Sequence, residues 1–314
     1  MGNTLIWIPK RLVELDLLSV AALSPQAFVD YCEKDYRDRI DAAARSVLNS
    51  GARVVMLTGP SSSGKTTTAH KLALQLQKLG THAAVVSLDN FFKNLEEYPL
   101  LPDGTPDYES VDALDVKEIN RCLLELTQTG CTEIPNFDFC REQRRMGRIP
   151  VQIGQGIAVV EGIHALNPRL TALLPPKSVY KIYAGLREEY STGGQRSLPT
   201  RDVRLARRMV RDYQFRGHSV EKTLSMWPAV CEGEDKNIKV FKPEADLLLD
   251  TSFSYEVCCL APLVCAHRGA LPAQSPYAQR LKSLCDTFAK CRTIPLSLVP
   301  EDSMLREFLG ENPQ

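Results

Sequence analysis

Apolar residues in the middle of the chain form short continuous runs that are separated by polar turns and by a helical repeat. Runs rich in Val, Ile and Leu are typical of strands buried on both faces of a parallel sheet, and they occupy residues 53–58, 83–88, 156–161, 178–183 and 245–250. The helical repeat lies between the first two runs. Strand, helix and strand in this order form a parallel unit with a right-handed crossover. The pattern therefore predicts a three-layer α/β fold around a mainly parallel central sheet.

The two ends of the chain have helical rather than strand-like patterns. An apolar stripe predicts a helical segment near the N-terminus, with its members at Phe28, Tyr31, Cys32, Tyr36, Ile40, Ala43, Ala44 and Val47. Two further helices are expected around residues 277–291 and 303–309. We therefore divide the chain into an N-terminal helical segment (1–50), a main domain (51–253) and a C-terminal helical extension (254–314).

Charge and composition limit the classes of partner. The chain has 314 residues and no net charge, since 38 Lys and Arg residues balance 38 Asp and Glu residues. Binding to long polyanions usually needs a net basic surface, so we expect no nucleic-acid partner. The ten cysteines include no Cys-x-x-Cys pair, which argues against structural zinc and favours reduced thiols. A signal-peptide pattern is absent and the longest apolar stretch, residues 257–266, is too short to span a bilayer. We expect a cytoplasmic protein that does not bind membranes.

A phosphate-binding motif follows the first predicted strand directly. The segment Gly59-Pro-Ser-Ser-Ser-Gly-Lys-Thr66 fits G-x-x-x-x-G-K-[ST]. Small residues let successive backbone N–H groups point at phosphate oxygens, and the following helix contributes its N-terminus. The lysine would reach the β- and γ-phosphates, and the threonine hydroxyl would bind Mg²⁺. The motif predicts binding of ATP and Mg²⁺ by Gly59, Ser61, Ser62, Ser63, Gly64, Lys65, Thr66 and Thr67.

Two carboxylates lie at the ends of predicted strands, where ligands bind in open α/β sheets. Asp89 follows the run 83–88 and Glu161 closes the run 156–161. Phosphoryl transfer needs a positioned acceptor hydroxyl and a proton acceptor, and we assign that role to Asp89. We assign Glu161 to Mg²⁺, directly or through water. A lone carboxylate after a strand is ordinarily a helix cap or a solvated turn residue; the phosphate motif is what favours function here.

A cluster of arginines follows the fourth predicted strand. Arg204, Arg207, Arg208 and Arg211 are spaced so that all four fall on one face of a helix. Like charges at this spacing repel one another unless anions lie nearby. We interpret the helix as a lid whose guanidiniums bind the polyphosphate. Two alternatives remain, a solvated face with intrahelical ion pairs and a nucleic-acid-binding stripe. The zero net charge and the lack of interleaved aromatic residues argue against the stripe.

Taken together, these motifs resemble the uridine kinase / phosphoribulokinase family of P-loop kinases over residues 53–250. The resemblance rests on motifs in the same order, namely GPSSSGKTT at 59–67, SLDNFF at 87–92, DYESVDALD at 107–115, IPNFDF at 134–139, VEGI at 160–163 and the arginine helix at 204–217. The run EGIHALNP at 161–168 and the Trp-Pro pair at 227–228 look like those of a bacterial uridine-kinase-like nucleoside kinase subgroup.

The resemblance implies a kinase that transfers the γ-phosphoryl group of ATP to the 5′-hydroxyl of a nucleoside. It implies that Asp89 is the acceptor base and that Arg208, Arg211 and Arg216 make lid contacts. With the phosphate motif and the arginine face, we expect Lys65, Arg208 and Arg211 to act with Asp89 and Arg207 and Arg216 to contact phosphate. The resemblance implies acceptor contacts at Phe92, Glu109, Phe137, Phe139, Glu142 and Arg208. Members of this family form dimers or tetramers, so a homo-oligomer is a further expectation.

The chain departs from the family pattern where an acceptor would be recognised. Phe92 and Phe137 stand in place of tyrosines, Glu142 in place of a histidine, Met226 in place of a glutamine, and Glu109 in place of a shorter aspartate. Loss of hydrogen-bonding groups weakens discrimination for one base. The acceptor is therefore open between a nucleoside such as uridine and a sugar, sugar phosphate or other polyol. A third hypothesis, an ATP-binding regulator without turnover, would not need Asp89.

Overall fold

The computed structural model describes residues 9–138 and 141–310. Its helices are α1 (Leu15–Ala21), α2 (Pro25–Ser50), α3 (Lys65–Lys78), α4 (Val116–Thr129), α5 (Thr200–Phe215), α6 (Val220–Asn237), α7 (Glu256–Cys265), α8 (Ala278–Phe288) and α9 (Arg306–Leu309). Its strands are β1 (Arg11–Glu14), β2 (Val54–Thr58), β3 (Ala83–Ser87), β4 (Cys131–Ile134), β5 (Phe137–Asp138), β6 (Gln143–Arg144), β7 (Ile149–Gln152), β8 (Ile157–Glu161), β9 (Val179–Gly185), β10 (Glu188–Thr192), β11 (Gln195–Leu198) and β12 (Leu247–Asp250).

A five-stranded sheet forms the centre of the molecule. Its strand order is β12-β9-β2-β8-β3, and every neighbouring pair is parallel. The strands match the predicted apolar runs to within two residues at each end. The prediction succeeded because these strands are buried on both faces, which demands continuous apolar sequence.

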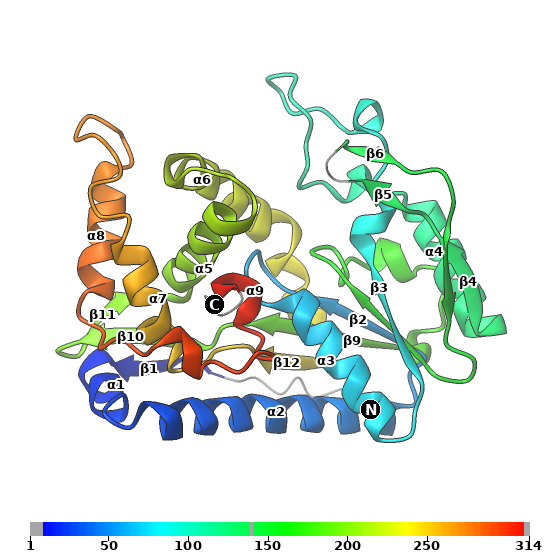
Figure 1. The fold of residues 1–314 in the computed structure, drawn as a ribbon. Coiled ribbons are helices and arrows are strands. Elements are labelled where there is room, and N and C mark those ends of the chain that lie inside the picture. Colours follow the sequence, from blue (N-terminus) through cyan, green and yellow to red (C-terminus); the bar gives the residue numbers. More distant parts are fainter. Residues whose placement is uncertain (1–8, 139–140, 311–314) are drawn as a thin grey trace.

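Helices cover both faces of this sheet (Figure 1). Alternate residues of β2 enter two separate cores, because successive side chains of a strand point to opposite faces. Val55 and Leu57 pack in the core that holds α2, α3 and α7. Val54 and Met56 pack in the core that holds α4. The predicted three-layer α/β fold is therefore confirmed, with helical extensions at both ends of the chain.

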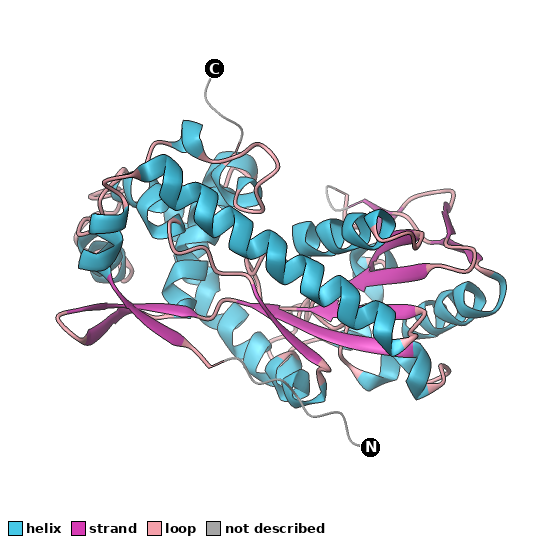
Figure 2. Cartoon of the chain, turned by 90° about the horizontal axis from the view of Figure 1, so that it is seen from below, coloured by secondary structure: helices cyan, strands magenta, loops and turns pink. Residues whose placement is uncertain are grey.

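The N-terminal part contains the long predicted helix and one unpredicted strand. Most of the predicted stripe on α2 is buried, but Tyr31 is 71% exposed, so its assignment to the stripe was wrong. The neighbouring Val29 is buried in its place. β1 pairs in parallel with β10, and β10 continues into the antiparallel hairpin β10–β11. These three strands form a small second sheet that projects at one end of the molecule (Figure 2).

The C-terminal part adds three helices, of which α7 was not predicted. Pro262 lies inside α7. Its residues Val257 to Ala261 are buried in the same core as α2 and α3. Phe288 of α8 and Phe308 of α9 belong to that core as well. One continuous core therefore joins the N-terminal helix, the sheet and the C-terminal helices.

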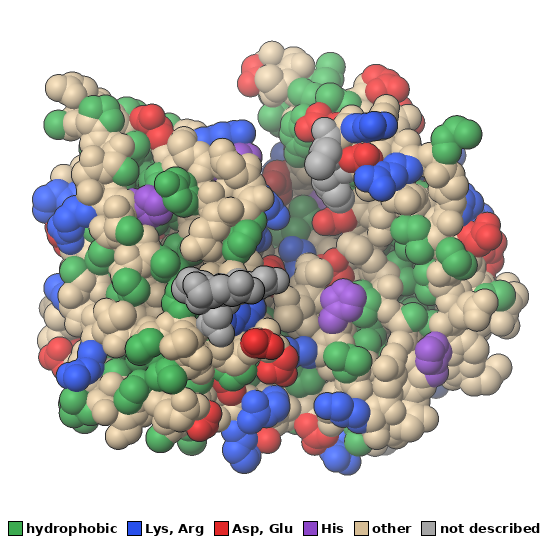
Figure 3. Space-filling model, viewed as in Figure 1, with side chains coloured by type: hydrophobic (Ala, Val, Ile, Leu, Met, Phe, Trp, Pro, Cys, Tyr) green, Lys and Arg blue, Asp and Glu red, His purple; other side chains and the backbone are tan. Residues whose placement is uncertain are grey.

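A cleft opens at the top of the molecule between the side that carries α6 and the side that carries β5 and β6 (Figure 3). Charged side chains of both signs are visible inside it. Among the helices of the described residues, none is both long and apolar enough to cross a bilayer.

Candidate phosphate and acceptor site

The predicted phosphate motif forms a tight loop between β2 and α3. Ser62 (φ 57°) and Gly64 (φ 80°) have left-handed backbone conformations, which turn successive N–H groups toward one side. A Cβ atom on Gly59 would lie 2.2 Å from the Ala184 carbonyl oxygen, so only glycine fits there. The helix α3 begins at Lys65 and directs its unpaired N–H groups into the same space. We name residues 59–67 the phosphate loop.

Two of the arginines that were predicted to form the lid bind backbone carbonyls of the phosphate loop. Arg204 donates to the Ser61 carbonyl at 2.9 Å and pairs with Glu234, which in turn accepts from the Ser61 N–H at 3.0 Å. Arg207 is fully buried, pairs with Glu256 at 2.6 Å and donates to the Ser62 carbonyl at 3.3 Å. Their donors are thus occupied by carboxylates and backbone, and a direct contact of Arg207 with phosphate stays a prediction.

The other arginines gather around one buried carboxylate beside the loop. Asp212 is fully buried and lies 3.1 Å from Arg208, 3.1 Å from Arg211 and 3.5 Å from Arg216. Arg208 also donates to the Ser61 hydroxyl at 2.7 Å. Burial and then repulsion by Arg211 lower the pKa of Arg216, against which Asp212 acts. Three cations on one anion leave positive charge next to the phosphate loop, where an anion would be stabilised.

The two strand-end carboxylates meet at the mouth of the phosphate loop. Glu161 accepts from the Ser87 hydroxyl at 2.7 Å and from the Thr66 hydroxyl at 3.1 Å. Ser87 and Glu161 are register partners on neighbouring strands, so the turn after β3 places Asp89 on the same edge. Both carboxylates therefore lie at the strand ends where the sequence placed them, and their roles toward acceptor and Mg²⁺ stay predictions.

The electrostatic surroundings of Asp89 come from three elements. Its side chain remains accessible to solvent, but the protein around it displaces much of the nearby water. This burial is the largest cause of its raised pKa, and the charge of Glu161 adds to it. Lys65 and Arg216 act in the opposite direction. Asp89 therefore lies within electrostatic reach of the loop lysine, the strand carboxylate and the arginine cluster.

The oxygens at this edge suit a magnesium ion. Mg²⁺ prefers hydroxyl, carboxylate, water and phosphate oxygens and is usually held by one or two protein carboxylates. The Thr66 hydroxyl and the Glu161 carboxylate, in contact with each other, provide such a set. Within residues 9–138 and 141–310 no group of three or more His, Cys, Asp or Glu side chains is placed to hold a metal by itself. Phosphate oxygens would have to complete the coordination.

Aromatic side chains line the region where an acceptor was expected. Phe92 lies 5.7 Å from Phe137 and 6.0 Å from Tyr98 between ring centroids, and Tyr98 lies 5.5 Å from Tyr108. The charges of Glu142 and Asp89 are among the causes that raise the pKa of Tyr98 to about 12, after burial and Tyr108. The predicted residues Phe92, Phe137 and Glu142 are thus brought together, whereas Phe139 lies outside the described residues.

Glu109 lies against α6, near the phosphate loop. Its carbonyl accepts from the Asn237 side chain of α6 at 2.8 Å. Its side chain lies against Gly233, where a Cβ atom would come 2.9 Å from Glu109 Cγ. Burial raises the pKa of Glu109, while Arg208 and Lys65 act against this. Glu109 is therefore positioned between α6 and the phosphate loop.

Sequence reasoning missed several residues that contact the predicted site. No local sequence pattern marks Glu234 or Glu256, because each pairs with its arginine only in the folded chain. Tyr98 lies outside every motif. Glu307 accepts from the Thr67 hydroxyl at 2.7 Å, and a Cβ atom on Gly64 would lie 2.3 Å from Met304 Sδ. The C-terminal segment thus touches the phosphate loop, which no pattern in the sequence indicated.

Part of the chain is similar to known proteins. Residues 54–180 match the Phosphoribulokinase / Uridine kinase family. The chain is 28% identical to a uridine kinase of Mycoplasma genitalium over 206 residues, which cover 65% of this chain and 87% of that protein. It is 30% identical to a uridine kinase of Schizosaccharomyces pombe over 178 residues, which cover 56% of this chain.

The extent of these matches differs between relatives. The chain spans about a third of the length of the uridine kinases of S. pombe and Saccharomyces cerevisiae (35% and 32%). The solved phosphoribulokinase from Rhodobacter spheroides has 16% sequence identity and a TM-score of 0.44, and the match covers 66% of this chain and 74% of that one. The match to the Phosphoribulokinase / Uridine kinase family is confined to residues 54–180, which are less than half of this chain.

Proposed function

We propose that the protein is an ATP-dependent kinase that phosphorylates a hydroxyl group of a small molecule. The observation that carries the proposal is the contact of Glu161 with Thr66, with Asp89 after the neighbouring strand and within electrostatic reach of Lys65. A protein that only bound ATP would need the phosphate loop but no carboxylate held beside it for an acceptor. The similarity of residues 54–180 to the phosphoribulokinase / uridine kinase family supports the same activity.

Each part of the site has a defined task in this proposal. The backbone N–H groups of the phosphate loop and Lys65 bind and orient the β- and γ-phosphates. Asp89 accepts the proton of the acceptor hydroxyl as the oxygen attacks the γ-phosphorus. Arg208, Arg211 and Arg216 stabilise the charge that spreads over the transferred group. A bound Mg²⁺, held by Thr66 and Glu161, would neutralise charge on the phosphate oxygens.

The acceptor that we favour is a nucleoside, phosphorylated at its 5′-hydroxyl. The matched relatives are uridine kinases, and the partly exposed ring of Phe92, which packs against Phe137 and Tyr98, offers a flat apolar surface against which a base can stack. Tyr98, whose ring lies 6.0 Å from that of Phe92, also carries a hydroxyl. A sugar or other polyol is the second candidate, because Glu109 and Glu142 provide two carboxylates that can accept from sugar hydroxyls.

An Asp89→Asn substitution tests the catalytic proposal. The amide keeps the shape of the side chain but is a far weaker proton acceptor, so turnover is expected to fall by about two orders of magnitude or more. ATP binding, measured by titration calorimetry, is expected to persist. Asp103→Asn, in an exposed loop of the same region, serves as the matched control and should leave both quantities unchanged. Unaltered turnover in the Asp89 variant would refute the assignment.

The acceptor is identified by measuring ATP consumption with separate panels of nucleosides, sugars and other polyols. We expect turnover with a nucleoside. Turnover with sugars or polyols alone would replace the nucleoside by the second candidate. ATP binding without turnover on any panel would favour a regulator instead of a kinase.

A further inference from the structure

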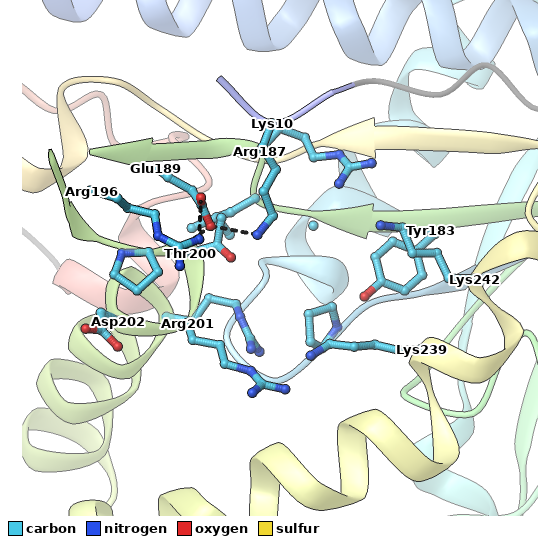
Figure 4. A pocket seen from close by; sticks show the side chains of 15 residues that line it. Lys10, Tyr183, Arg187, Glu189, Arg196, Thr200, Arg201, Asp202, Lys239 and Lys242 are labelled. Carbon is cyan, nitrogen blue, oxygen red and sulfur yellow. Dashed lines mark hydrogen bonds and ion pairs between the residues drawn. The ribbon is translucent and has the colours of Figure 1, made fainter. Parts of the chain in front are cut away.

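A second charged pocket lies beside the phosphate loop. It encloses about 540 Å³ and is bounded by β9, the β10–β11 hairpin, the start of α5 and the 3-10 turn η6 (Lys239–Glu244) (Figure 4). Tyr183, on its floor, belongs to the core on the α4 side. Of the phosphate loop, only Pro60 lines this pocket. The pocket therefore adjoins the loop without including the atoms that face phosphate.

Cations dominate the lining. Seven of the fifteen lining residues are Lys or Arg and two are acidic, and the basic ones are Lys10, Arg187, Arg196, Arg201, Arg204, Lys239 and Lys242. They come from both walls, with Lys10, Arg187 and Arg196 facing Arg201 and Lys239 in Figure 4. Clefts lined by one sign of charge concentrate ligands of the opposite sign.

The carboxylates near the pocket are fewer than the cations that line it. Glu189 is shared by Lys10 at 2.6 Å and Arg196 at 3.1 Å. Asp235, just outside the lining, is shared by Arg201 at 2.6 Å and Lys239 at 2.7 Å. The second acidic lining residue, Asp202, pairs with Arg280. Glu189 and Asp235 thus each serve two cations of the pocket, and Glu234 pairs with Arg204 and lies 3.9 Å from Lys239. These three carboxylates are outnumbered by the seven basic lining residues, which leaves an excess of positive charge.

The cations are close enough to repel one another. Burial is the largest cause that lowers the pKa of Lys242 to about 8, and repulsion by Arg187, Lys10 and Lys239 lowers it further. The ammonium group lies 5.2 Å from the centre of the Tyr183 ring. An anion between these groups would relieve the repulsion. The N-terminus of α5, whose N-cap Pro199 offers no side-chain acceptor, opens on the same space and adds a partial positive charge.

We propose that this pocket binds a small polyanion that carries at least two phosphate groups, at a site separate from the phosphate loop. A linked pair of phosphates can contact cations of both walls at once, such as Arg196 and Arg201. The volume is in the range of small-ligand sites. Arginines suit phosphate oxygens because their planar donors bind two oxygens together.

The contribution of the pocket can be separated from that of the phosphate loop by working in a Lys65→Ala background. Inorganic tripolyphosphate is titrated into the full chain by calorimetry at low ionic strength. In this background we expect one saturable site. Adding Arg196→Gln and Lys239→Gln leaves Glu189 paired with Lys10 and Asp235 paired with Arg201. Affinity is expected to fall about tenfold or more, since two charge-assisted contacts are lost.

A matched double variant removes the same charge elsewhere. Lys34→Gln with Lys282→Gln lies on the surfaces of α2 and α8, away from the pocket, and should leave the affinity unchanged. Should the first double variant fail to fold, judged by circular dichroism, Lys10→Gln alone is used and is expected to weaken binding severalfold. Absence of a saturable site, or equal weakening in the control pair, would overturn the proposal.

Discussion

Asp89 is the residue whose protonation should control the rate. Burial and Glu161 raise its pKa above 3.8, while Lys65 and Arg216 limit the rise. A base must be deprotonated to accept the hydroxyl proton, so kcat/KM should fall as the pH drops through this raised pKa. The midpoint of the fall in kcat/KM at low pH therefore measures the pKa of Asp89, which its surroundings set.

Replacing Arg216 by Gln should move that midpoint to higher pH. Without this cation the ionised form of Asp89 loses stabilisation, and its pKa rises further. The measurement is the pH dependence of kcat/KM, read at its midpoint because the maximal rate is also expected to fall. Arg211→Gln is the control: it removes another cation of the Asp212 cluster that is not among the groups acting on Asp89. Equal midpoints in both variants would contradict the assignment of Asp89 as the base.

Glu307 places a carboxylate against the first turn of α3. Its contact with the Thr67 hydroxyl, at 2.7 Å, lies where the sequence predicts bound nucleotide. A negative charge there opposes phosphate, so Glu307→Gln should tighten ATP binding about fivefold, which corresponds to about 1 kcal/mol of relieved repulsion. Calorimetric titration with ATP measures this. Glu301→Gln, an exposed carboxylate of the same segment, should have no effect. Weaker ATP binding in the Glu307 variant would show that this contact supports the nucleotide site.

At the scale of elements, α5 is attached to the phosphate loop through buried ion pairs. Arg204 with Glu234 and Arg207 with Glu256 each join a guanidinium of α5 to a carboxylate of another helix while also binding loop carbonyls. Arg208 and Arg211, on the same helix, instead adjoin Asp212. The helix therefore has two kinds of arginine, one that fixes the loop and one that offers charge beside it.

Arg207→Met tests this attachment through stability. Glu256 would remain fully buried without its partner, which is expected to cost about 3–5 kcal/mol in the free energy of unfolding. Burial already raises the pKa of Glu256, and Arg207 opposes that rise. In the variant the folded-state pKa should be higher still, so the folded state binds the proton more tightly and stability should recover as the pH falls through that pKa.

Urea denaturation at pH 8 and pH 5 measures this recovery. Arg201→Met removes an exposed arginine of the same helix, paired with Asp235, and should cost less than about 1 kcal/mol at either pH. A loss in the Arg207 variant that is small or independent of pH would contradict the role of the buried pair.

At the scale of the whole molecule, the C-terminal helices are part of the main core. Phe308 is fully buried in α9, and the Arg207 guanidinium lies 4.9 Å from the centre of its ring. Phe308→Ala should therefore lower the free energy of unfolding of the whole chain by about 3–5 kcal/mol. Leu173→Ala, at a 59% exposed position, should change it by less than about 0.5 kcal/mol. A separate early transition for the C-terminal part in chemical denaturation would instead indicate an independent unit.

The sequence by itself determined the central strands, the phosphate loop and the positions of Asp89 and Glu161. Each depends on the local order of residues: an apolar run marks a buried strand, and the residue after a parallel strand lies at the edge of the sheet where ligands bind.

Tertiary structure alone decided the rest. The pairing of β1 with β10 and the contact of Glu307 with Thr67 join residues far apart in the chain. Tertiary structure also decided which arginines of α5 fix the phosphate loop. Their spacing places all of them on one face of the helix, but the carboxylates that pair with Arg204 and Arg207 come from α6 and α7. The periodicity of apolar residues predicts which side chains of one helix or strand are buried. It cannot predict a counterion or a pocket wall, because these come from segments that are distant in the sequence and that only the fold brings near.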